Sequence, residues 1–430
     1  MDTALSAFPK LYGSYNRSES KEISHEEICH EEICHEETCH EQITDELMEI
    51  FCRYPKIRSL FMKSIEKAKK KNPDRMTNPA QSLSEYLDYL DWCAKPLPWT
   101  MKPFTVRSTV FERIDQGLEY FYFILDQPLE ELKGMGYYYN SLQYVEPVAE
   151  WMRRYAKKWG RFLSSEESWN DSFLKMVLNE PRFNMDKGWY EDQSNWHSFN
   201  DFFSRKLASP SVRPVDHRDD DSVVVSPADA MPQGVWDIDE SSNIIGDNGV
   251  LIKSNHFYSA CQLIGSGSRY SDEFASGKLT HTFLNVDDYH RYHFPVSGTI
   301  KEVRMIPAHD AAGGITVWDE KAGKYDLNST EPGWQWIETR GCVIIDMGEH
   351  GLAAILPIGM SQVSSVNFTD NVRVGEKVKK GDDLGYFLFG GSDIVMIFQQ
   401  MSDFRFICPL SEKGGYCHMY MGQRYGTFRR

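Results

Sequence analysis

Two stretches in the N-terminal half of the chain repeat apolar residues with the period of an α-helix. One falls within residues 83–90 and the other within 148–159, where basic side chains occupy the opposite side. Apolar residues three and four positions apart share one helix face, and such a face is normally buried. We therefore predict a helical accessory domain over residues 44–195, with these core positions: Leu83, Tyr86, Leu87, Leu90, Val148, Trp151, Met152, Tyr155 and Trp159.

The pattern changes near residue 196, where short β-rich runs separated by Gly and Pro replace the helical period. The segment Val372–Gly385 alternates and turns in the manner of β-sandwich carrier domains, without their lysine-bearing hairpin tip. The predicted fold is α+β, with a β-rich, barrel-sandwich-like domain over 196–430 after the helical one. The predicted strands are Ser222–Val225, Val250–Ile252, Leu279–Asn285, Gly298–Ile306, Cys342–Met347 and Leu352–Ile358.

A short stretch near the C-terminal end combines a turn with a buried strand. Phe389, Gly390 and Gly391 lead into Ser392, and the apolar run Ile394–Phe398 follows. A run of that length bounded by turn residues is typical of a core strand. Taken alone, the stretch is a common Gly-Gly turn with a serine at its edge.

Residues 1–43 are predicted to be a low-complexity segment. A pentapeptide of the form His-Glu-Glu-Ile-Cys recurs through residues 25–40. Five residues advance a helix by about 500°, and an odd period alternates the faces of a strand, so neither conformation gathers the His and Cys side chains. The repeat therefore favours a solvated segment over a metal site.

Composition narrows the class of protein. A chain of 430 residues suggests two domains, and 41% hydrophobic residues suffice for globular cores. The net charge of −16 argues against a nucleic-acid partner. No apolar stretch approaches the roughly 20 residues of a bilayer span, and residues 1–24 lack the features of a signal or transit peptide. With nine scattered cysteines, an odd number, we expect reduced thiols and a soluble, cytoplasmic protein.

An acid, a histidine and a serine are the minimum set for activating a serine nucleophile. Asp229 lies in a turn after a Val-rich strand, and His290 and His293 follow the strand that ends at Asn285. On an extended segment the two histidines face opposite sides, so they need not share a role. Ser392 lacks the Gly-x-Ser-x-Gly elbow of common serine hydrolases.

Four motifs in the same order resemble those of the phosphatidylserine decarboxylase family, whose members make their own pyruvoyl cofactor. The resemblance covers roughly residues 199–400, and the helical region is similar to the extra domain of a fungal-type branch. Tryptophan decarboxylases of that branch share the Phe-Gly-Gly-Ser motif, at a place where typical lipid-acting members have Leu-Gly-Ser-Thr. The motifs are Phe199–Leu207, Ser226–Asp229, Asp288–His293, and Lys379–Gly385 with the later Gly391-Ser392.

The resemblance implies self-cleavage between Gly391 and Ser392. Ser392 Oγ would attack the Gly391 carbonyl, and elimination and hydrolysis would leave a pyruvoyl group at the new N-terminus. By the same resemblance His293 is the base for Ser392, Asp229 orients and stabilises it, and His290 assists decarboxylation. The pyruvoyl carbonyl would then form a Schiff base with the substrate amine and accept the electrons released as CO₂ leaves, without pyridoxal phosphate.

Gly359 matches a segment of the family that packs close to the site, and Tyr289 and Phe294 are further candidates for the substrate pocket. No metal site is implied. The two cleaved chains are expected to stay associated, and a homo-oligomer is compatible with the sequence.

Three positions depart from the family pattern: Ala230, Met360 and Asp393. A carboxylate at Asp393 would oppose negative charge developing on the neighbouring ester. Three functions follow. The first is a decarboxylase of a free, aromatic or otherwise specialised amino acid. The second is a phosphatidylserine decarboxylase that makes phosphatidylethanolamine, and the third is a non-catalytic binding module that has lost the processing.

Overall fold

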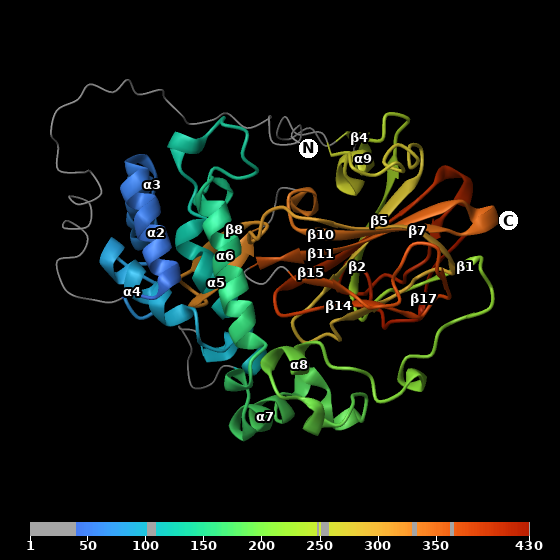
Figure 1. The fold of residues 1–430 in the computed structure, drawn as a ribbon, viewed down its shortest axis with the longest axis horizontal. Helices are drawn as coiled ribbons and strands as arrows, with labels where there is room; N and C mark the ends of the chain where they lie inside the picture. Colours follow the sequence, from blue (N-terminus) through green and yellow to red (C-terminus); the bar gives the residue numbers. More distant parts are fainter. Residues whose placement is uncertain are drawn as a thin grey trace.

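The computed structural model describes residues 40–100, 109–246, 249–250, 258–328, 333–361 and 365–429. Residues 25–39 of the His/Cys repeat lie outside these ranges, so its predicted character is untested. Helices α2 to α8 precede the first strand, and most of the remaining chain forms antiparallel strands (Figure 1). The predicted α+β class is confirmed.

The helical part shares one hydrophobic core with Ala312, Tyr325 and Phe389 of the second half of the chain. Its apolar stripes are buried as predicted, with the whole Val148–Trp159 stripe inside and only Leu83 half-buried. Side-chain caps define the helix starts: Ser82 accepts from Glu85 N at α4, and Thr109 and Glu112 form a reciprocal capping box at α5. The helices are α2 (Gln42–Arg53), α3 (Pro55–Lys71), α4 (Leu83–Cys93), α5 (Val110–Leu125), α6 (Val148–Leu163), α7 (Asp171–Leu178) and α8 (Phe199–Phe203), with the later α9 (Ala260–Ile264). No helix of the described residues is long and apolar enough to cross a membrane.

A nine-stranded antiparallel sheet organises the second half of the chain, with the strand order β13-β7-β10-β11-β15-β5-β2-β3-β4. Three smaller sheets have the orders β1-β17-β16, β12-β14-β6 and β8-β9. The strands of the large sheet are β13 (Lys377–Val378), β7 (Gly298–Ile306), β10 (Arg340–Asp346), β11 (Leu352–Met360), β15 (Gly391–Phe398), β5 (Lys278–Leu284), β2 (Met231–Ile238), β3 (Ile244–Gly246) and β4 (Gly249–Val250). The others are β1 (Val223–Val225), β6 (Arg291–His293), β8 (Ile315–Asp319), β9 (Lys324–Asn328), β12 (Val366–Phe368), β14 (Asp383–Phe387), β16 (Arg405–Phe406) and β17 (Arg424–Thr427).

Strand β15 is buried on both faces, which explains its continuous apolar run. Ile394, Met396 and Phe398 enter one core cluster, while Val395 and Ile397 enter the cluster on the other face. Its neighbour β11 pairs with it along its whole length, and its neighbour β5 pairs with Ser392–Phe398. The strand that begins at the predicted cleavage site is therefore an interior strand.

The helical part is attached to the sheet through an insertion between β7 and β10, which contains the β8–β9 hairpin. Figure 1 shows β8 reaching in among α5 and α6. Both ends of the Gln116 amide bond the Tyr325 backbone, at 2.7 and 2.8 Å, and both ends of Gln143 bond the backbone of residues 312 and 314, at 3.0 and 3.1 Å. Asp126 Oδ2 accepts from Thr316 N at 2.5 Å. These buried polar contacts fix the relative position of the two parts.

Candidate functional site

Ser392 is the second residue of β15. It pairs in register with Gly359 on β11 and with Leu284 on β5. Its side chain is completely buried, and its Oγ has no hydrogen-bond partner among the residues that the structure describes. A buried hydroxyl without a partner costs about 1–3 kcal/mol, so this one is held in place by its surroundings rather than by its own bonds.

The residues before Ser392 are anchored by the helical part. The Phe389 ring lies edge-on to Trp159, Phe199 and Phe203 at 5.3–5.5 Å between centroids, and Phe389 N donates to Asn200 Oδ1 at 3.0 Å. Gly390 then adopts a φ of 143°, a conformation that side-chain-bearing residues rarely adopt. The aromatic anchor and the glycine together set the path of the chain into Gly391.

Asp393 lies on the opposite face of β15 from Ser392, because successive strand residues alternate. Its carboxylate is completely buried and is 3.0 and 3.2 Å from Nδ1 of His281 on β5. Gln335 Nε2 donates to it at 3.2 Å. The carboxylate expected to disturb the ester is thus hydrogen-bonded to two partners and directed away from the serine.

His293 ends β6 and is buried. Its Nδ1 donates to Gly381 O at 3.0 Å, which leaves Nε2 as the acceptor, 3.2 Å from the Tyr289 hydroxyl. Burial lowers its pKa below the ordinary value, against the opposing effects of Asp383 and of Asp229. A neutral imidazole with its lone pair on Nε2 is the form that a general base requires.

His290 has different surroundings, as the three-residue spacing predicted. Its ring stacks on Phe203 at 3.9 Å between centroids, and its Nδ1 donates to Asp288 O at 3.0 Å. Burial, and then the positive charge of Arg205, lowers its pKa to about 3. This histidine is neutral at any physiological pH.

Asp229 is bound by Arg213 rather than by a histidine. Arg213 Nη2 donates to Oδ2 at 2.7 Å and Nε lies 3.0 and 3.1 Å from the two carboxylate oxygens, with both side chains buried. Met421 N adds a third donor at 2.9 Å. The structure shows no hydrogen bond between Asp229 and His293, so the predicted role of Asp229 in orienting His293 stays a prediction. The Asp229 carboxylate raises the pKa of His293 through space.

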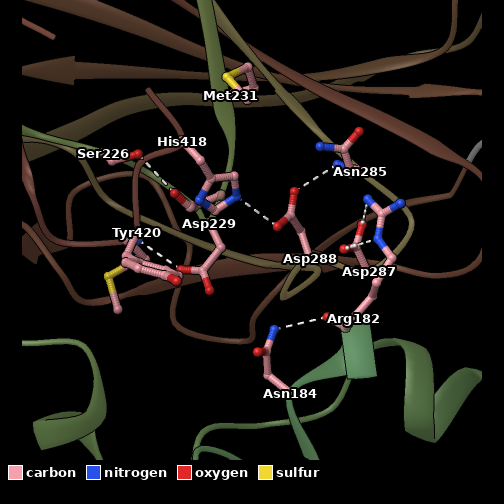
Figure 2. A network of polar contacts seen from close by, with 12 residues as sticks. Arg182, Asn184, Ser226, Asp229, Met231, Asn285, Asp287, Asp288, His418 and Tyr420 are labelled. Carbon is pink, nitrogen blue, oxygen red and sulfur yellow. Dashed lines mark hydrogen bonds and ion pairs between the residues drawn. The ribbon is translucent and has the colours of Figure 1, made fainter. Parts of the chain in front are cut away.

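Figure 2 shows a second acid–histidine pair beside Asp229. His418 Nε2 is 2.8 Å from Asp288 Oδ1, and Asp288 Oδ2 accepts from Asn285 N at 2.8 Å. Asp288 directly precedes Tyr289 and His290, whereas His418 belongs to the segment after Ser392. The pair therefore connects the two chains that cleavage would create.

The three predicted pocket residues have different positions. Tyr289 is buried at Nε2 of His293, and Gly359 faces Ser392 across the β11–β15 ladder. Phe294 lies in the sheet core, in the cluster that includes Tyr292 and Leu284. Tyr289 and Gly359 thus border predicted catalytic residues, while Phe294 packs in the interior.

Several residues of this site were absent from the sequence-based prediction. Arg213 precedes a proline in a Pro/Asp-rich stretch and shows its role only through Asp229. Arg205 lies inside the quoted Phe199–Leu207 motif; it is completely buried and donates to the carbonyls of Asp287 and Asp288 at 3.2 and 3.1 Å. The sequence offered one indication of this role, since Arg205 stands between the phenylalanines and the leucine of that motif.

Residues 199–427, more than half of the chain, match the model of a family described as phosphatidylserine decarboxylase. The chain belongs to the phosphatidylserine decarboxylase family, a family of carboxy-lyases. Helices α2 to α7 precede the matched region.

Individual relatives cover different shares of the chain. Phosphatidylserine decarboxylase proenzyme 2 of Oryza sativa is 30% identical over 59% of this chain and 37% of its own length. The phosphatidylserine decarboxylase proenzyme of Fusobacterium nucleatum is 26% identical over 67% of this chain and 89% of its own length. Decarboxylase iboD of Amanita muscaria is 28% identical over 48% of this chain and 58% of its own length. The chain thus spans well under two thirds of the rice relative and slightly less than two thirds of the Amanita one.

Proposed function

We propose that the chain cleaves itself between Gly391 and Ser392 and then decarboxylates a free amino acid. The observation that carries the proposal is the buried Ser392 Oγ, which lacks a partner and lies next to a Gly-Gly pair at the start of an interior strand. The names of the relatives support the class of reaction, and two of the three name a proenzyme.

The proposed steps of cleavage use the chain's own residues, although Ser392 Oγ and His293 Nε2 are not hydrogen-bonded to each other in the structure, where Nε2 lies 3.2 Å from the Tyr289 hydroxyl. His293 Nε2 takes the hydroxyl proton of Ser392, Oγ bonds to the Gly391 carbonyl carbon, and the C–N bond breaks to give an ester. Loss of the Ser392 Cα proton expels the Gly391 carboxylate and leaves dehydroalanine. Water then replaces the nitrogen, which leaves as ammonia, and a pyruvoyl group remains at residue 392. Once formed, this group supplies a carbonyl that takes up the electrons released in decarboxylation.

A small, water-soluble substrate is supported by two features. The net charge of −16 disfavours an anionic surface as partner, and the relative from Amanita has a name that specifies no lipid. The second candidate, decarboxylation of phosphatidylserine, is favoured by the names of the rice and Fusobacterium relatives. We also propose that the β-rich part has the barrel-sandwich-like arrangement expected from the sequence.

Intact-mass spectrometry of the purified protein tests cleavage directly. We expect one chain that ends at Gly391 and a second, of residues 392–430, blocked by a pyruvoyl group. Ser392→Ala should leave a single chain, and so should His293→Ala. Ser402→Ala is the matched control, since it removes another buried serine hydroxyl, one that donates to His350 O. An uncleaved wild-type chain would favour a non-catalytic binding module.

The substrate is then tested by offering the processed protein free amino acids and phosphatidylserine separately and measuring CO₂. Release from amino acids supports the proposal. Release from phosphatidylserine alone contradicts it and supports the second candidate.

A further inference from the structure

A cavity of about 330 Å³ opens in the helical part, between the loop that follows α3, helix α4 and helix α5. Its volume is at the lower end of the range of about 300–1,000 Å³ that is usual for small-molecule pockets. In Figure 1, α4 lies on the side of the helical part that faces away from the large sheet. The family match begins only at residue 199, so the cavity is separate both from the candidate site at Ser392 and from the matched region.

One face of α4 forms much of the cavity wall. Glu85, Asp88, Tyr89 and Trp92 all line the cavity. Residues with the spacing i, i+3, i+4 and i+7 share one side of a helix, so these four side chains point in similar directions. This side differs from the apolar stripe of α4 that was predicted from the sequence. Helix α4 therefore presents two carboxylates and two aromatic rings to the cavity.

Three adjoining aromatic rings line the cavity. The centroid of the Tyr89 ring lies 6.2 Å from that of Trp92 and 5.5 Å from that of Tyr120, which meets Tyr89 edge to face. Tyr89 and Tyr120 are buried, whereas Trp92 is 42% exposed, although tryptophan side chains are on average highly buried. Aromatic rings of this kind attract cations through the negative charge on their faces, and tryptophan does so most strongly.

The charged side chains of the cavity leave one carboxylate available. Arg75 Nη1 donates to Glu85 Oε1 at 2.5 Å, and Glu85 Oε2 accepts from Gln81 N at 2.7 Å. The bond from Gln81, and after it the Arg75 guanidinium, hold the pKa of Glu85 below its usual range, so Glu85 is ionised and compensates Arg75. Asp88 has no hydrogen bond or ion pair within the part of the chain that the structure describes. The charge that remains for a ligand is therefore negative.

We propose that this cavity binds a small organic cation, an ammonium group carried on a flat, apolar body. The Asp88 carboxylate supplies the opposite charge, and the rings of Tyr89, Trp92 and Tyr120 supply cation–π attraction and apolar contact. The inference goes beyond the proposed function and does not depend on it. It assigns a binding site to the helical part, which so far has only a structural role.

Isothermal titration calorimetry of the full chain with Ser392→Ala tests the inference. This variant has no serine from which a pyruvoyl group could form, so an amine cannot attach covalently at residue 392. The three probes share a phenyl body and differ in charge: 2-phenylethylammonium, phenylalanine and 3-phenylpropanoate. We expect saturable binding of the cation at one site per chain, weaker binding of the zwitterion and no binding of the anion.

Two substitutions locate the site. Asp88→Asn should weaken binding of 2-phenylethylammonium by about 2- to 5-fold and reduce its dependence on salt, as for an exposed charge pair. Trp92→Leu should weaken it by about 3- to 10-fold, while Trp92→Phe, which keeps an aromatic ring, should lose less. Glu49→Gln is the matched control, since it neutralises another exposed carboxylate, on α2 and outside the cavity lining, and should leave the affinity unchanged. Should Trp92→Leu fail to fold, Asp88→Asn and Trp92→Phe decide the matter.

Absence of saturable binding of the cation overturns the inference. Equal or tighter binding of 3-phenylpropanoate also overturns it and indicates an anion site at Arg75. Binding that neither Asp88→Asn nor Trp92→Leu weakens takes place elsewhere on the chain and overturns it as well. Failure of the proposed function shows in the mass of the wild-type chain, whereas failure of this inference shows in the titrations of the uncleaved variant.

Discussion

The ion pair between Arg213 and Asp229 offers a quantitative test of the site. The two side chains are 4% and 3% exposed, and the guanidinium makes contacts of 2.7–3.1 Å with both carboxylate oxygens. Removing one member of a buried pair leaves the other charge uncompensated, which costs about 3–5 kcal/mol. We expect Arg213→Met to lower the free energy of unfolding by that amount.

Substituting the other member of the pair, Asp229→Asn, should lower the free energy of unfolding by a similar amount because the buried guanidinium loses its counter-charge. The amide oxygen can still accept from Met421 N. The double variant should cost clearly less than the two single costs added together, by at least about 2 kcal/mol, since neither charge is then left alone. Self-cleavage should slow in Asp229→Asn, because the Asp229 carboxylate raises the pKa of the proposed base His293 through space and its loss makes His293 a weaker base.

Urea unfolding measures the costs, with Ser392→Ala present in every variant so that all are compared as one chain. A time course of small-chain formation, with Ser392 intact, measures cleavage. Single costs below about 1 kcal/mol, or strict additivity in the double variant, would refute the reasoning that this pair is a coupled buried unit.

Three further outcomes are expected. The pKa of His290 is about 3 in the folded chain and near 6.5 in the unfolded chain, so between pH 3 and 6.5 only the unfolded chain protonates this imidazole. The free energy of unfolding should therefore fall as the pH drops below 6.5, by about 2 kcal/mol at pH 5. Urea unfolding at a series of pH values should show a smaller loss for His290→Phe. His281→Ala should lower the free energy of unfolding, measured in urea, by about 1.5–3 kcal/mol because the buried Asp393 loses one of its two partners. Adding Asp393→Asn to this variant should recover part of that loss. No loss in the single variant would contradict the pairing. His418→Ala removes the side-chain bond to Asp288, yet the small chain should still remain bound in native mass spectrometry. Dissociation would show that this partly buried pair, rather than strand pairing, holds the small chain.

The strands that could be predicted from the sequence are runs rich in apolar and β-branched residues with a Gly or Pro near one end. Gly298–Ile306 was placed without error, and the predicted runs in β5, β10 and β11 differ from the observed strands by one or two residues. The strand β2 was missed because its run Met231–Ile238 mixes a proline, a glycine and polar residues, and only three of its eight residues are buried. Short strands such as β6 and β14 take their conformation from pairing with each other, which local sequence does not record.

The candidate site was predicted as residues but not as contacts. Ser392, His293 and Asp229 were named from their order in the chain, whereas their partners come from distant segments: Arg213 for Asp229, Tyr289 and Gly381 for His293. Spacing along the sequence carries no information about such pairs. The expectation for Asp393 illustrates the same limit, since its hydrogen bonds with His281 and Gln335 depend on strand alternation and on a short 3-10 helix 58 residues earlier in the chain.

The interior position of β15 has a consequence for how the molecule folds before and after the proposed cleavage. Its neighbours β11 and β5 both belong to the part before Gly391, so the segment after the cut is surrounded by the segment before it. Such an arrangement can be assembled only while the chain is continuous, because an isolated 39-residue fragment has too little surface to bury on its own. If the proposed cleavage takes place, the intact precursor can unfold and refold, whereas the two chains, once separated, have lost the covalent link between β15 and its neighbours in the sheet.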